Sequence, residues 1–251
     1  TMDYDQAVSQ GKITLLGAET DERFLSNVME QVNDKAVVEQ MADTFKMVYT
    51  PFHGTGYQLI PEALKRLGMK HVICVPEQMV IDGNFPTVIS PNPENPEGFY
   101  LAVDLAKAND ADFILGSDPD ADRVGIAMKC PDGSYELVSG NEMGVLLLDY
   151  ICAGRIEQGT MPKDPVMCKS IVSTPLADAI AAHYGVEMRR CLTGFKYIGD
   201  IIADVEQKEG SYESFLLGFE ESYGYLSGGY VRDKDAVDGS MLICEMASYY
   251  K

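Results

Sequence analysis

Residues 46–75 read KMVYTPFHGTGYQLIPEALKRLGMKHVICV. The apolar run at 46–50 predicts a strand, and the run at 71–75 predicts a second one. Between them, apolar residues recur at helical spacing over 59–67, and Gly68 ends this predicted helix. The stretch therefore predicts strand, helix and strand, the unit from which parallel sheets with crossover helices are built.

The same alternation extends along the rest of the chain. The segment 82–98 is rich in Pro, Asn and Gly and predicts a loop, and Pro131-Asp132-Gly133-Ser134 predicts a hairpin turn. The turn at 53–56 is interpreted as packing between domains, with His53 in a structural role. Further strands are predicted at 111–115, 124–128, 135–138, 165–168, 186–191 and 216–219, and helices at 99–108, 141–152, 175–184, 195–205 and 236–250.

The pattern predicts an α/β fold of two consecutive α/β domains, each a mainly parallel mixed sheet with flanking helices. We place these domains at 40–136 and 137–251. Residues 1–39 are polar and prone to form helices, and we expect a tether with one or two amphipathic helices from a preceding domain. Two domains of about 100 residues each fit the usual size of a domain.

Composition limits the kinds of partner. The 251 residues carry 39 acidic and 20 basic side chains, a formal net charge of -19. Such a surface repels nucleic acid and anionic membranes, so we expect neither as a partner, and any phosphate site must be a local basic island. The six scattered cysteines form no C-x-x-C pair, which favours a reducing, cytoplasmic compartment over a zinc site or a disulfide framework. No apolar run reaches the roughly 18 residues of a membrane span.

The most informative stretch is the acidic loop Gly116-Ser117-Asp118-Pro119-Asp120-Ala121-Asp122-Arg123. In an extended turn, carboxylates at i, i+2 and i+4 can converge, and without a cation their mutual repulsion would raise their pKa values. Hard oxygen ligands suit Mg²⁺ or Ca²⁺. An EF-hand would need Gly at its sixth position and Glu at its twelfth, where this chain has Arg123 and Lys129. The loop therefore predicts a Mg²⁺ site with positions open to a phosphate oxygen, and an acidic surface turn is the alternative.

Two further loops have the composition of ligand sites. Glu220 and Ser222 are two residues apart after a predicted strand, so on an extended segment they face the same way and could hold two sugar hydroxyls. Thr193-Gly194-Phe195-Lys196 opens a predicted helix, where free N–H groups and a lysine favour an anion. An ordinary polar strand end and a plain helix start are the alternatives.

The acidic loop resembles the metal loop of the α-D-phosphohexomutases, the phosphoglucomutase and phosphomannomutase family. The resemblance implies that Asp118, Asp120 and Asp122 bind Mg²⁺ and that Arg123 assists at the reacting phosphate. It also implies that Lys234 acts at the edge of the active site.

Other segments resemble this family as well. The segment Gly218-Phe219-Glu220-Glu221-Ser222 is similar to its sugar-binding loop, which implies that Glu220 and Ser222 hold the hexose ring. Family members often have Gly-Glu-x-Ser, and here Phe219 stands between the glycine and the glutamate. The remaining substrate contacts implied by the resemblance are Thr193, Gly194 and Lys196, from the family's T-G loop, and Lys169.

The resemblance covers residues from about 40 to the end. Family members have four domains, and the first carries a phosphoserine in a Thr-x-Ser-His-Asn-Pro type of loop, for which this chain has no counterpart. We therefore expect the two middle domains of a longer enzyme, inactive without the first and fourth. The implied reaction interconverts hexose 1-phosphate and hexose 6-phosphate through a bisphosphate. A pentose-phosphate or bisphosphate-synthesising mutase, and a noncatalytic module that binds Mg²⁺ and sugar phosphate, remain alternatives.

Overall fold

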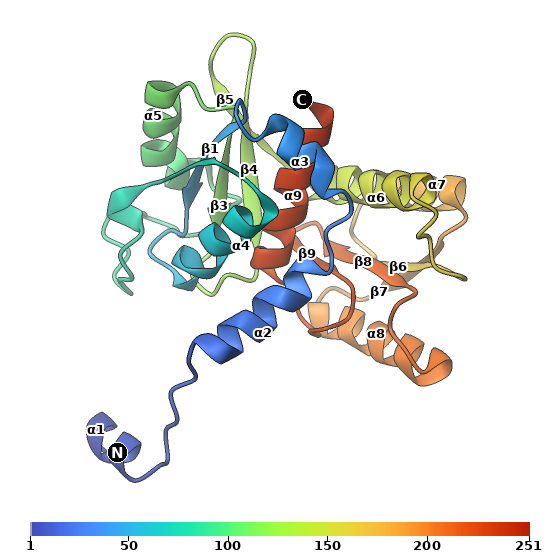
Figure 1. The fold of residues 1–251 in the computed structure, drawn as a ribbon, viewed down its shortest axis with the longest axis horizontal. Coiled ribbons are helices and arrows are strands. Elements are labelled where there is room, and N and C mark those ends of the chain that lie inside the picture. Colours follow the sequence, from blue (N-terminus) through green and yellow to red (C-terminus); the bar gives the residue numbers. More distant parts are fainter. Residues whose placement is uncertain (1) are drawn as a thin grey trace.

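The computed structural model describes residues 2–251 and contains two mixed sheets with helices packed on their faces (Figure 1). The strands are β1 (Lys46–Thr50), β2 (His71–Cys74), β3 (Phe113–Ser117), β4 (Val124–Lys129), β5 (Tyr135–Val138), β6 (Val166–Ser170), β7 (Glu187–Cys191), β8 (Phe215–Glu220) and β9 (Gly224–Ser227). The helices are α1 (Tyr4–Ser9), α2 (Ala18–Met29), α3 (Lys35–Met41), α4 (Leu59–Leu67), α5 (Tyr100–Asn109), α6 (Gly140–Glu157), α7 (Leu176–Tyr184), α8 (Phe195–Glu209) and α9 (Ala236–Tyr250).

The first sheet has the strand order β2-β1-β3-β4-β5. Strand β1 pairs in parallel with both β2 and β3, whereas β4 and β5 add as antiparallel strands. Helix α4 buries Ile60, Ala63, Leu64 and Leu67, and it ends where Gly68 takes the left-handed conformation at φ 113°. The sequence-based prediction of strand, helix and strand at 46–75 is therefore confirmed.

The second sheet has the strand order β7-β6-β8-β9. The pairs β6–β7 and β6–β8 are parallel, and β8–β9 is antiparallel. Alternate residues of β6 face opposite layers, so that Met167 joins the core shared with α6, whereas Val166 and Cys168 join the core against α8. The predicted fold class, two mixed α/β sheets with flanking helices, is confirmed.

Helix α9 lies between the two sheets (Figure 1). It packs against α3, α4 and α6 and against β4 and β9, and nearly all of its side chains are buried. One apolar core runs from the first sheet through α9 to the second sheet. The last predicted helix of the 137–251 unit therefore shares its packing with the 40–136 unit, and the two units form one continuous core.

Two sequence-based expectations need correction. No strand was predicted at 224–227, where the short strand β9 pairs with β8. Helix α6 continues to Glu157 rather than ending near 152. The turn at 53–56, interpreted as packing between domains, makes its tightest contacts with Pro119, within the first unit. Over residues 2–251, no helix is both long and apolar enough to cross a membrane.

Candidate active site

The acidic loop joins the antiparallel strands β3 and β4, and the turn at 53–56 packs against it. The N–H and the hydroxyl of Thr55 both donate to the carbonyl of Pro119, at 2.8 and 3.1 Å. A Cβ on Gly54 would overlap the backbone of Pro119, so only glycine permits this approach. His53 is buried and hydrogen-bonded to Val80 and Thr87, which agrees with a structural role.

The three aspartates of the loop converge. Asp118, Asp120 and Asp122 each offer one carboxylate oxygen, and these oxygens lie within 4.8 Å of one another. Asp118 is buried, Asp122 is half-buried and Asp120 is exposed. A buried, a half-buried and an exposed carboxylate with hard oxygen atoms make a donor set that fits Mg²⁺ and leaves one side open.

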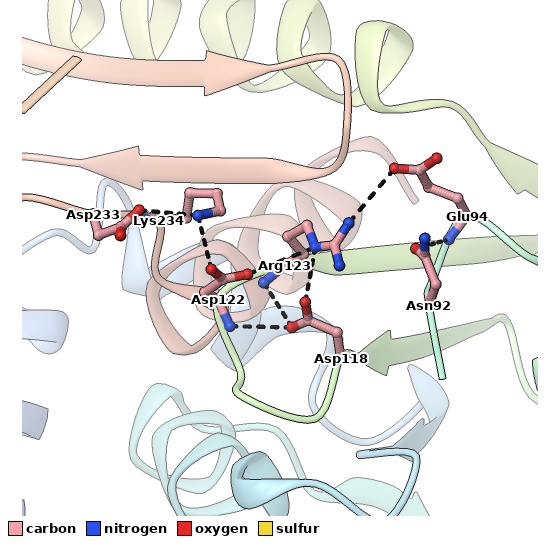
Figure 2. Close-up of polar contacts among 7 residues, drawn as sticks. All are labelled: Asn92, Glu94, Asp118, Asp122, Arg123, Asp233 and Lys234. Carbon is pink, nitrogen blue, oxygen red and sulfur yellow. Dashed lines mark hydrogen bonds and ion pairs between the residues drawn. The ribbon is translucent and has the colours of Figure 1, made fainter. Parts of the chain in front are cut away.

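Asp118 is held in place by the loop that it starts (Figure 2). Its Oδ1 accepts hydrogen bonds from the N–H groups of Asp122 and Arg123, at 3.1 and 2.9 Å, and its Oδ2 accepts from Arg123 Nε at 2.8 Å. Burial is the main cause that raises the pKa of Asp118 to about 6, and the charge of Asp122 adds to it, whereas the bonds from Arg123 lower it. The site therefore concentrates negative charge, which a divalent cation would stabilise.

Two cationic side chains border this loop. Lys234 Nζ lies 2.7 Å from Asp122 Oδ2 and 3.0 Å from Asp233 Oδ1, and Arg123 Nη1 lies 3.8 Å from Glu94 Oε1 (Figure 2). Burial alone would lower the pKa of Lys234, but the two carboxylates outweigh it and raise the pKa, so the ammonium stays charged. Arg123 and Lys234 are the positively charged groups beside the loop, and the carboxylates around them outnumber them, so the predicted basic island is not present as such.

Glu94 was not anticipated from the sequence. It lies in the Pro- and Asn-rich loop between β2 and α5, and Pro93 brings it to the site by packing against Gly125, where a Cβ would lie 2.9 Å from the carbonyl of Pro93. Nothing in the local pattern of residues links this loop to Arg123, because the contact depends on how the loop folds back over β4.

The predicted sugar loop connects β8 to β9. Glu220, the last residue of β8, is buried, and its Oε1 accepts a hydrogen bond from the N–H of Gly194 at 2.6 Å. Ser222 is half-buried in the following turn. Gly194 precedes α8 with φ 122°, a conformation that favours glycine. The structure therefore brings together Glu220 and Gly194, two residues that the sequence assigned to separate loops.

The remaining predicted contacts divide into two groups. Thr193 and Lys196 are exposed beside Gly194, and Lys196 Nζ lies 4.9 Å from the centre of the Tyr197 ring. Lys169 is buried and directed elsewhere: its ammonium donates to the carbonyls of Ser173 and Thr174, both at 2.9 Å, and pairs with Asp178 at 3.1 Å. These contacts occupy the three donors of Lys169, so its predicted substrate contact would require them to rearrange.

Backbone hydrogen bonds join the acidic loop to the predicted sugar loop. The N–H of Val124 donates to the carbonyl of Tyr223 at 3.1 Å, and Arg123 and Gly224 form an isolated antiparallel bridge. The aliphatic stem of Lys234 crosses Gly224 so closely that a Cβ there would overlap it. The carboxylate cluster and the turn from Glu220 to Gly224, called the Glu220 turn below, are therefore fixed relative to one another.

Comparisons with known proteins match both units. Residues 22–133 match the family described as "Phosphoglucomutase/phosphomannomutase, alpha/beta/alpha domain II", and residues 139–251 match domain III of the same family. A phosphoglucomutase of Staphylococcus aureus (strain MRSA252) is 40% identical over 206 residues, 82% of this chain and 36% of that relative. A phosphomannomutase of Mycoplasmoides pirum is 40% identical over 202 residues, 80% of this chain and 36% of that relative.

Solved structures with low sequence identity share the fold. A putative phosphomannomutase from Thermus thermophilus superposes with a TM-score of 0.71 at 19% identity, covering 92% of this chain and 47% of that one. The N-acetylphosphoglucosamine mutase of Aspergillus fumigatus, solved in complex with GlcNAc-6P and magnesium, gives a TM-score of 0.57 at 13% identity, covering 88% and 47%. The chain thus spans a little over a third of the length of the two curated relatives, and just under half of these two solved chains.

Proposed function

The chain belongs to the phosphoglucomutase/phosphomannomutase family, and we propose that it supplies the metal-binding and sugar-binding units of an enzyme that interconverts hexose 1-phosphate and hexose 6-phosphate. The observation that carries the proposal is the convergence of Asp118, Asp120 and Asp122, with oxygens within 4.8 Å, directly beside the Glu220 turn. Backbone hydrogen bonds fix this cluster to the turn after β8, and this supports a ligand that reaches both rather than a cation alone.

The three aspartates are proposed to hold Mg²⁺, which fits their oxygen donors and appears with a sugar phosphate in the solved Aspergillus fumigatus relative. When bound, Mg²⁺ would neutralise charge on the transferring phosphoryl group. Arg123 and Lys234 would bind the other phosphate oxygens, since both lie beside the cluster and both are positively charged. Positioned charges of this kind stabilise a transferring phosphoryl group without a covalent role for the residues that carry them.

Glu220 and Ser222 are proposed to bind hydroxyls of the hexose ring. Gly194 holds the Glu220 carboxylate, so that it is oriented before the sugar arrives. Thr193, Gly194 and Lys196 are proposed to bind the phosphate at the far end of the sugar, because an exposed cation lies there next to a helix N-terminus. For the N–H of Gly194 this requires its bond to Glu220 to rearrange. The phosphoryl group itself would be carried by a serine in another domain of the same polypeptide.

The division into units at 40–136 and 137–251 is part of the proposal, as are a cytoplasmic, reducing compartment and the absence of nucleic acid or membrane partners. The high net negative charge of -19 supports the last point, because it repels polyanions.

The test is a mutase assay of the full-length polypeptide with glucose 1-phosphate, mannose 1-phosphate and ribose 1-phosphate, each with and without Mg²⁺. Mg²⁺-dependent turnover of a hexose phosphate supports the proposal. A clear preference for ribose 1-phosphate, or binding of sugar phosphate without turnover, would overturn the assignment to a hexose mutase.

A further inference from the structure

Glu221 lies between the two proposed sugar ligands, but its side chain contacts a different loop. Its Oε2 accepts hydrogen bonds from the hydroxyls of Ser170 and Ser173, at 2.7 and 3.2 Å. The two serine oxygens are themselves 2.8 Å apart, and both serines are buried. Each hydroxyl has one proton, so the carboxylate is the acceptor that satisfies both.

The loop that carries these serines is fixed from several sides. Ser170 ends β6 and Ser173 follows in the turn before α7. The ammonium of Lys169 binds the carbonyls of Ser173 and Thr174, and the N–H of Thr174 donates to Asn141 Oδ1 at 2.8 Å. Glu221 is therefore hydrogen-bonded to a loop, 170–174, that is itself held by hydrogen bonds to Lys169 and Asn141. This loop is called the platform below.

The main chain of Glu221 is held as well as its carboxylate. Gly140 begins α6, and a Cβ at this position would overlap the carbonyl oxygen of Glu221. The peptide of Glu221 thus rests directly on the first turn of α6, while its side chain reaches the platform at Ser170 and Ser173. Because both its main chain and its side chain are held, Glu221 restricts the conformations open to its neighbours Glu220 and Ser222.

We propose that Glu221 is a positioning residue, which keeps Glu220 and Ser222 in the orientation that meets the sugar hydroxyls. The inference rests on the proposed function of this turn and adds to it a residue that does not itself touch the sugar. Hydrogen bonds to a charged acceptor are stronger than neutral ones, so the two serine contacts hold the turn firmly. Without them the turn samples other conformations, and the affinity for sugar phosphate falls in proportion to the loss of the competent one.

The experiment uses the 251-residue chain with Mg²⁺ and three measurements. Calorimetry gives the Kd of glucose 1-phosphate and of mannose 1-phosphate, hydrogen exchange reports the amides of residues 221–224, and Mn²⁺ titration by electron paramagnetic resonance reports the metal loop. The variants are Glu221→Ala, Glu221→Gln, Ser170→Ala and the double variant Glu221→Ala with Ser170→Ala. Glu213→Ala, which removes an exposed carboxylate just before β8, is the matched control.

For Glu221→Ala we expect the Kd of the sugar phosphate to rise roughly tenfold, the equivalent of about 1.4 kcal/mol. Amide exchange at 221–224 should accelerate and the Mn²⁺ affinity should stay unchanged, because the metal loop is intact. Glu221→Gln should recover most of the affinity, since its amide oxygen still accepts from one serine. Adding Ser170→Ala to Glu221→Ala should cost nothing further.

Unchanged sugar affinity and unchanged exchange in Glu221→Ala would overturn the inference, as would fully additive losses from Glu221 and Ser170. A parallel loss of Mn²⁺ affinity would also overturn it, because the role would then be general stability. If the native chain binds neither sugar phosphate, the proposed role of the turn fails. Exchange at 221–224 then decides the positioning role alone: acceleration supports it and no change refutes it.

Discussion

Replacing Asp238 by Asn should make the chain more stable at neutral pH. Asp238 lies on α9 between the two sheets and is fully buried. Its Oδ2 and Oδ1 accept hydrogen bonds from the N–H and the hydroxyl of Ser227, both at 2.7 Å. Burial is the main cause that raises the pKa of Asp238 to about 8, and the charges of Asp235 and Glu245 add to it.

The direction of the pH dependence follows from the raised pKa. The folded chain binds this proton more tightly than the unfolded chain, in which the pKa of Asp238 is near 3.8. The free energy of unfolding should therefore fall as pH rises from about 4 to about 8 and then level off. At about 1.36 kcal/mol for each pH unit, the contribution lost between pH 4 and pH 7 is about 4 kcal/mol. The raised pKa values of Asp235 and Glu245 act in the same direction.

Asparagine has the same shape and cannot ionise. Its Oδ1 can accept from the N–H of Ser227 and its Nδ2 can donate to the Ser227 hydroxyl, so both contacts persist. Urea unfolding, followed by circular dichroism between pH 4.5 and 8.5, should show an Asp238→Asn variant that exceeds the native chain by several kcal/mol at pH 7 and by little at pH 4.5. Asp200→Asn makes the same substitution at an exposed position of α8 and should change stability by less than about 0.5 kcal/mol. A difference between the Asp238 variant and the native chain that does not depend on pH would refute this reasoning.

Four further outcomes follow from the site. Asp120→Asn should weaken Mn²⁺ binding without lowering the metal-free melting temperature, because it removes an exposed like charge. A melting temperature several degrees lower would indicate that the acidic loop has a structural role instead. Ser222→Ala in the full-length enzyme should reduce kcat/KM by about one to two decades, through loss of roughly 1–3 kcal/mol of hydrogen bonding. In this variant, a deoxy sugar phosphate that lacks the matching hydroxyl should show little further loss of kcat/KM. Losses that simply add for every deoxy position would exclude a direct contact. Gly140→Ala should weaken sugar-phosphate binding, since its Cβ overlaps the carbonyl of Glu221, whereas Gly17→Ala, which has open space around it, should not; equal effects would contradict the contact. The isolated 251-residue chain should show no turnover of glucose 1-phosphate, and measurable turnover would place the phosphoryl carrier within it.

The elements that local pattern specifies were predictable from the sequence. The spacing of apolar residues predicted strand β1 and helix α4, and Gly68 predicted where the helix ends. The acidic loop was recognisable because its residues are consecutive and directly follow a buried strand. The convergence of its carboxylates needs only the β3–β4 turn, so the geometry was accessible from spacing alone. Strand β9 was missed because it is short and lies between a polar turn and the glycine pair Gly228-Gly229, although Gly224 is required in it by the stem of Lys234.

Contacts between distant segments could not be predicted in this way. Glu245 illustrates the reason: a glutamate in a predicted helix ordinarily indicates the solvent face, but here it is buried and accepts hydrogen bonds from the N–H groups of Asn33 and Asp34 and from the hydroxyl of Tyr150. The polar partners come from α6 and from the turn before α3, and only the folded chain brings them together. Lys169 is a local case: its carbonyl partners lie in the loop that follows its own strand, and the sequence did not show that this loop turns back toward its ammonium.

The position of α9 explains how two units with separate sheets can share one site. Its N-terminus is fixed to the acidic loop, because the N–H of Ala236 donates to the carbonyl of Ala121 at 3.0 Å. The residue before it, Asp235, donates its N–H to the carbonyl of Tyr225 in β9 at 3.0 Å and caps the helix through its carboxylate. Lys234 therefore comes directly before the capping residue of a helix that is anchored to both loops. A rotation of one sheet against the other would have to break these backbone bonds, so the distance between the carboxylate cluster and the Glu220 turn is set by α9 rather than by a flexible linker.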